Sequence, residues 1–140
     1  MSILSDFFIA ECSGVPSYSG DAGFPAEDRC QLKRITPLEA AGMVAAIRGT
    51  EDPISCISEI ERLTPSDAEE WIMSMPQDFI DTLASTEETA VPALAERFAS
   101  VTADELGWSA SEFTDVVADL ASLARRAKAQ GKSIYLWNCL

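Results

Sequence analysis

Hydrophobic positions recur at helical spacing along the last third of the chain. Between residues 110 and 130 they follow the i, i+3, i+4, i+7 pattern that places one apolar stripe along an α-helix. The members of this stripe are Phe113, Val116, Val117, Leu120, Leu123, Ala124 and Ala127. Ser109 and Glu112 have the spacing of a capping box, and Gly131 suits the left-handed conformation that ends a helix. The pattern therefore predicts an amphipathic helix over 110–130.

Two short runs of branched and aromatic residues, 6–10 and 134–137, lie near the ends of the chain. Residues of these types favour β-strands, so each run is predicted to be a strand. We expect the two strands to pair in antiparallel fashion, because pairing removes an exposed edge from each of them. We also expect this arrangement to bring Cys12 and Cys139 close together.

Polar caps and prolines predict a series of helices between these two strands. Thr36 and Pro37 start a helix that Gly49 ends. Asp52 and Pro53 open a second helix, whose apolar face is expected to contain Ile54, Ile57, Ile60 and Leu63. Shorter helices are expected behind Pro76 and around residues 91–101, where Pro92 must lie within the first turn.

Residues 68–75 are compatible with two structures. Trp71, Met73 and Met75 alternate as in a strand, whereas Trp71, Ile72 and Met75 also fit one face of a helix. We favour the helix, because the acidic residues at 67, 69 and 70 suit a first helical turn. A strand beside the terminal pair is the alternative.

Between residues 13 and 31, glycine, serine and proline interrupt any helical or strand periodicity of the apolar residues, which predicts a long loop. Tyr18 and Phe24 within it could anchor a partner, or could only hold the loop on the core, and we favour the second interpretation. With this loop, residues 1–140 are expected to form a single globular domain. The fold class expected is mainly α (α+β): a helical domain with a small antiparallel sheet formed by the N- and C-terminal strands.

The charge of the chain limits its partners. The net charge is −13, and the segment from Glu51 to Asp119 contains seventeen acidic and two basic residues, a local charge of −15. Nucleic-acid binding requires clustered Lys and Arg, so neither DNA nor RNA is expected as a partner. No apolar run is long enough for a membrane span, and four cysteines without a signal peptide favour the cytoplasm. We interpret these cysteines as reduced, buried thiols.

Few residues in the sequence are suited to catalysis. Histidine is absent, which removes the usual general base and the commonest transition-metal ligand. Glu112, Asp115 and Asp119 share one face of the predicted helix 110–130, and carboxylates are ligands for hard cations. A row of acids along one helix is more typical of a solvated face than of a metal cage. We therefore expect neither an enzyme nor a bound metal or cofactor.

An acidic protein of this kind suits a binding role, so we predict a small cytoplasmic protein that masks a basic protein partner. In bacteria this is the role of an immunity protein or antitoxin. The predicted contact residues are Asp104, Glu105, Glu112, Asp115 and Asp119, with Tyr18 and Phe24 from the loop. The alternatives are a stand-alone domain with an adaptor or housekeeping role and, less favoured, a carboxylate-based metal binder or enzyme.

Overall fold

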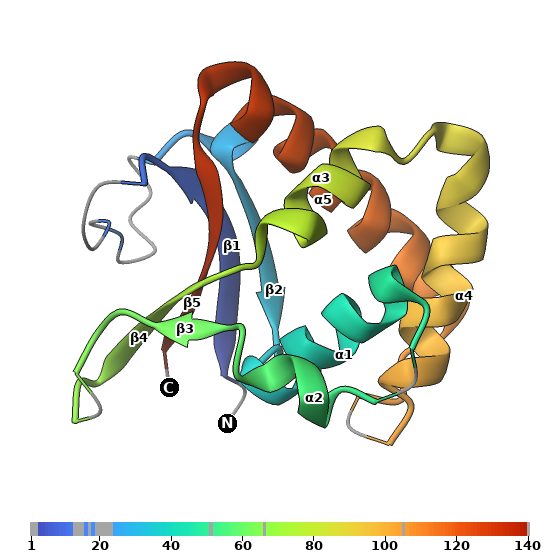
Figure 1. Ribbon diagram of the computed structural model, residues 1–140, viewed down its shortest axis with the longest axis horizontal. Coiled ribbons are helices and arrows are strands. Elements are labelled where there is room, and N and C mark those ends of the chain that lie inside the picture. Colours follow the sequence, from blue (N-terminus) through green and yellow to red (C-terminus); the bar gives the residue numbers. More distant parts are fainter. Residues whose placement is uncertain are drawn as a thin grey trace.

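The computed structural model describes residues 3–12, 16, 18, 24–50, 52–65, 67–104 and 106–139. These residues form one five-stranded antiparallel sheet, with the helices packed against one of its faces (Figure 1). In chain order the elements are β1 (Leu4–Ala10), η1 (Ala26–Asp28), β2 (Arg29–Lys33), α1 (Pro37–Arg48), α2 (Ile54–Ile57), β3 (Glu61–Arg62), β4 (Glu70–Ser74), α3 (Gln77–Ser85), η2 (Glu88–Ala90), α4 (Val91–Val101), α5 (Ala110–Gln130) and β5 (Ser133–Cys139).

The strands from the two ends of the chain lie side by side in the middle of the sheet, in the order β2-β1-β5-β4-β3. β1 and β5 pair over their whole lengths, from Leu4 opposite Cys139 to Ala10 opposite Ser133. The predicted antiparallel pairing of the chain ends is therefore confirmed. It forms the centre of the sheet, and each of the two strands carries a further strand on its other side.

The long helix is also confirmed, because α5 begins at Ala110 and ends at Gln130. The Ser109 hydroxyl oxygen accepts a hydrogen bond from the backbone N–H of Glu112 at 3.1 Å, which caps the first turn. Gly131 ends the helix with a φ of 66°, a conformation that costs glycine little. Local signals at both ends therefore fix the direction in which the chain enters β5.

The expected fold class was wrong in the extent of the sheet. The sheet is not a small one made only from the chain ends, since β2, β4 and β3 extend it on both sides and make the fold α+β. β2 begins at Arg29, within the predicted loop 13–31, whose earlier part falls largely outside the described residues. We attribute the difference to the free edges of β1 and β5, which offer backbone hydrogen bonds to any strand that can reach them.

The helix favoured for residues 68–75 was wrong, and the alternative strand is confirmed. β4 pairs with β5 so that Ile72 lies opposite Trp137 and Met73 lies opposite Leu136. Ile72 then packs on one face of the sheet and Met73 on the other, which is the alternation of a strand buried on both faces. Burial on both faces, together with pairing, outweighs the preference of acidic residues for a first helical turn.

The second predicted helix is shorter than expected, because α2 is a single turn over Ile54–Ile57. Ile54 is 73% exposed, whereas Ile60 is buried beyond the end of the helix. The chain turns there to form β3, which pairs with β4. The predicted apolar face of Ile54, Ile57, Ile60 and Leu63 is therefore not formed.

The two cysteines near the chain ends are not neighbours, so that expectation was wrong. Cys139 lies opposite Leu4, at the start of β1, whereas Cys12 follows Ala10 at its end. Antiparallel pairing places residues that follow two strands at opposite ends of the pair. Cys30 and Cys56 are buried as interpreted, but Cys12 is exposed.

The two faces of the sheet carry separate apolar clusters. Phe7, Ile134 and Leu136 point toward the helices and join the main core. Phe8, Tyr135 and Trp137 point to the opposite face, where Tyr18 and Phe24 pack on them. We call this second side the aromatic face. Because the sheet separates the two clusters, groups on the aromatic face and groups on the helices belong to different surfaces.

The central position of β5 leads to a prediction about stability. Replacing the fully buried Leu136 with alanine (Leu136→Ala) should lower the free energy of unfolding by about 2–5 kcal/mol, because it removes packed methyl groups and leaves a cavity. Ile54→Ala is the matched control and should change this energy by less than about 0.5 kcal/mol, since Ile54 is mostly exposed. Urea denaturation followed by circular dichroism measures both, and equal losses would contradict the central role of β5.

Candidate functional site

The candidate acidic residues lie on the solvent side of α5. The apolar stripe of this helix, including Phe113, Val117 and Leu120, is buried against α3, α4 and the sheet. Glu112, Asp115 and Asp119 are exposed, as their spacing on one helix face predicts. We call these three residues the α5 acidic face.

The other acidic candidates lie in the segment that precedes α5. Asp104 is exposed in the turn that leads from α4 toward α5, and Glu105 lies outside the described residues. Asp119 marks the end of the acidic face nearest to β2. Burial and the nearby Asp119 carboxylate together raise the pKa of the Cys30 thiol, on β2, to about 12.

A few acids in the described part of the chain form ion pairs, whereas the acids on α5 do not. Asp28 accepts two hydrogen bonds from Arg126, and Asp81 forms an ion pair with Lys128 at 3.1 Å. Within the described part of the chain, no ion pair involves the side chains of Glu112, Asp115 or Asp119. The basic residues at the C-terminal end of α5 thus tie the helix to other elements, and its acidic face keeps its charge.

Tyr18 and Phe24 lie on the aromatic face, on the other side of the sheet from α5. The Tyr18 ring stacks on Phe8 with ring centres 4.3 Å apart, and the Phe24 ring meets both rings edge to face. The Tyr18 hydroxyl donates a hydrogen bond of 2.5 Å to the buried Asp6 carboxylate, and burial followed by this bond raises the pKa of Tyr18 to about 12. Tyr18 is therefore packed against the sheet and is not an exposed anchor.

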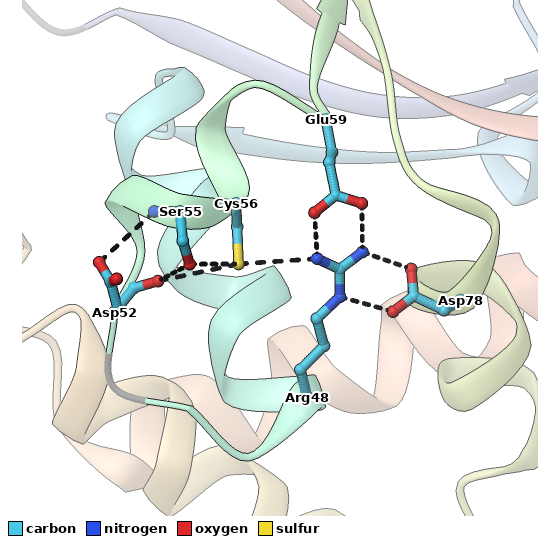
Figure 2. A network of polar contacts seen from close by, with 6 residues as sticks. All are labelled: Arg48, Asp52, Ser55, Cys56, Glu59 and Asp78. Carbon is cyan, nitrogen blue, oxygen red and sulfur yellow. Dashed lines mark hydrogen bonds and ion pairs between the residues drawn. The ribbon is translucent and has the colours of Figure 1, made fainter.

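A network around Arg48, which sequence reasoning missed, joins three segments of the chain (Figure 2). Arg48 ends α1, Glu59 follows α2 and Asp78 lies in the first turn of α3. The guanidinium binds both carboxylates in bidentate fashion, with Nε to Asp78 at 2.7 Å and Nη2 to Glu59 at 2.8 Å, and its Nη1 also binds Glu59. These contacts join the end of α1 to the segment after α2 and to the first turn of α3.

The same network leaves no donor for a ligand. Arg48 has five N–H groups, of which four bind the two carboxylates and the fifth points at the Cys56 sulfur, 3.8 Å from Nη1. Hydrogen bonds from Arg48 lower the pKa values of Glu59 and Asp78, and these two carboxylates raise the pKa of Arg48. Arg48 is thus a structural connection and not a site for phosphate or carboxylate ligands.

The described residues form neither a metal site nor a membrane-spanning helix. No group of three or more acidic or cysteine side chains among them is placed to hold a metal ion. None of the helices in the ranges that the structure covers has the length and apolar character needed to cross a bilayer.

Comparisons with protein-family models, with curated proteins and with solved structures found no match. The function of the site therefore has to be inferred from its own chemistry.

The Arg48 network leads to a prediction about pH. A carboxylate whose pKa is lower in the folded state than in the unfolded state stabilises the fold at neutral pH, and this contribution is lost as the pH falls through about 4 and below. In Arg48→Met the pKa values of Glu59 and Asp78 should return toward their ordinary range. The melting temperature should then be lower than that of the wild type at pH 7, and the difference should shrink by pH 3.

Arg97→Met is the control for this experiment, because it removes the same charge from an exposed position on α4. Thermal unfolding from pH 7 to pH 3 should show a pH-dependent loss only for the Arg48 variant. Equal curves for the two variants would mean that the network adds nothing to the fold beyond its charge.

Proposed function

We propose that this chain is a small acidic binding protein that masks a basic protein partner through the α5 acidic face. The proposal is carried by one observation: Glu112, Asp115 and Asp119 are exposed together on one face of the long helix α5 and make no ion pairs among the described residues. The surplus negative charge is therefore available to a second molecule.

A helix face of this kind is better suited to binding than to stability. Asp115 and Asp119 are like charges at i and i+4, which destabilise a helix by a few tenths of a kcal/mol. Cations from a partner would relieve this repulsion. Because all three acids project from a rigid helix, they would meet such cations at fixed spacing, and complementary charge accelerates association and sets orientation.

The role that fits this chemistry is inhibition of a protein whose own surface is basic. Proteins that act on nucleic acids or nucleotides carry such surfaces, because they bind phosphate groups with Lys and Arg. An immunity protein or antitoxin acting in the cytoplasm is the bacterial form of this role. The alternative is an adaptor or housekeeping domain whose acidity serves solubility alone.

The decisive experiment reverses the charges of the face and compares the result with an equal change elsewhere. The test variant is E112K/D115K/D119K, and the control variant E87K/E88K/E96K changes three exposed acids between the end of α3 and the middle of α4. Each variant has a formal net charge of −7 instead of −13, since each reversal adds two units. Both should fold as the wild type does, because all six positions lie outside the apolar core.

Capture from native lysate at low and high salt, quantified by mass spectrometry, identifies the partner, and stopped-flow mixing then gives the association rate. We expect the test variant to lose the partner and the control to retain it. Association with the wild type should slow as salt rises. If the two variants capture the same proteins as the wild type, or if none of the three captures any, the α5 acidic face is only a solvated surface.

A further inference from the structure

The short helix α2 places two isoleucines on the outside of the molecule. Ile54 is 73% exposed and Ile57 is 38% exposed, and their spacing makes them neighbours on one helical turn. Cys56, which lies between them in the sequence, is buried and fixes the direction of the turn. We call Ile54 and Ile57 the α2 apolar pair. Single exposed apolar residues are common on protein surfaces, whereas adjacent ones form a patch of the kind that marks an interaction site.

The rest of the fold holds this turn in place. The Cys56 sulfur lies 3.8 Å from Nη1 of Arg48 and 3.8 Å from the backbone carbonyl oxygen of Asp52 (Figure 2). Beyond the turn, Arg48 binds the Glu59 carboxylate through two nitrogens, and Ile60 is buried. The α2 apolar pair is therefore presented on a fixed support, and a fixed support lowers the entropy that is lost when a partner binds.

Acidic side chains flank the α2 apolar pair. Asp52 precedes the pair in the sequence, Glu59 and Glu61 follow it, and all three are exposed. The segment 52–61 contains no lysine or arginine. Arg48 does not reverse this charge, because it is bound to two carboxylates and the network keeps a net negative charge. A surface with an apolar centre and a negative rim is complementary to a partner whose apolar side chains are flanked by cations.

We propose that the α2 apolar pair binds an amphipathic segment of a partner protein, whose apolar side chains cover Ile54 and Ile57 and whose lysine or arginine side chains meet the flanking acids. The charge selects this occupant. A second copy of the chain would bring the same net charge of −13 to the contact, and an anionic membrane surface would be repelled in the same way. The inference does not rest on the α5 acidic face, because α2 packs on α1, whereas α5 packs on α3 and α4 (Figure 1).

A synthetic amphipathic helix of leucine and lysine is the probe, and the same peptide with glutamate in place of lysine is its charge control. Titration of ¹⁵N-labelled protein with the lysine peptide, followed by two-dimensional NMR, should give saturable shifts that include the backbone amides of residues 54–61. The affinity should fall as salt rises, because complementary charges contribute to binding. The glutamate peptide should give no shifts in this segment.

Ile54→Ala tests the apolar centre. It should weaken binding of the lysine peptide at residues 54–61 by about tenfold or more, since truncation of a central anchor removes a large part of the binding energy. Leu4→Ala is the control, because Leu4 is also exposed, at 42%, but lies on β1. It should bind the peptide as the wild type does. The variant E112K/D115K/D119K should also keep these shifts, which separates this test from the one on the α5 acidic face.

The proposal is overturned if the lysine peptide gives no saturable shifts in residues 54–61, if Ile54→Ala binds it there as tightly as the wild type, or if the affinity is independent of salt. Sedimentation equilibrium of the protein alone and flotation with phosphatidylcholine vesicles test the two other occupants. Self-association or vesicle binding that Ile54→Ala abolishes would assign the α2 apolar pair to a second copy or to a membrane, and would equally overturn the proposal.

Discussion

The backbone pairing of β1 with β5 is the interaction on which the rest of the structure depends. It joins residues more than 120 positions apart in the chain, and its two outer edges are the only places where β2 and β4 attach within the described sheet. The register of this pairing also determines which face of the sheet each side chain occupies. Phe7 and Leu136 point toward the helices, whereas Phe8 and Trp137 point to the aromatic face. A shift of one residue in the pairing register of a strand would move its side chains to the opposite face of the sheet. The position of α5 follows as well, since Gly131 connects this helix directly to β5.

Features that depend on interactions between residues close in the sequence could be predicted, whereas features that depend on distant residues could not. The bounds of α5 depend on the Ser109 cap and on Gly131, and the start of α1 depends on Pro37 at its first position, so local patterns were sufficient. β4 depends on an edge that the distant β5 provides, and its own residues fit either structure. The Arg48 network was beyond sequence reasoning for the same reason, because its partners are 11 and 30 residues away. The acids on α5 could be placed because helical spacing alone determines a shared face.

Several basic side chains of this protein bind acidic side chains or carbonyl oxygens of other elements, whereas many acidic side chains stay exposed. Arg48, Arg126 and Lys128 bind acids from other elements, and Arg125 donates to the carbonyl oxygens of Ala84 and Thr86 at the end of α3. These bases hold elements together, as cations at a helix C-terminus commonly do. The sequence has only ten bases against 23 acids, so in the part of the chain that the structure describes most acids form no ion pair with a base. The excess of acids, which the composition sets, is therefore left on the surfaces that these ion pairs do not occupy.

The separation of β1 from β5 along the chain also has a consequence for synthesis. Translation proceeds at about 5–20 residues per second, so β1 waits on the order of ten seconds before its central partner exists. During that time Phe7 and Phe8, both fully buried in the finished fold, have no sheet to enter. Contacts between distant residues also form slowly after synthesis, because a long loop must close first. The nascent chain is thus expected to depend on chaperones that cover apolar segments, more than a helical bundle of the same length would.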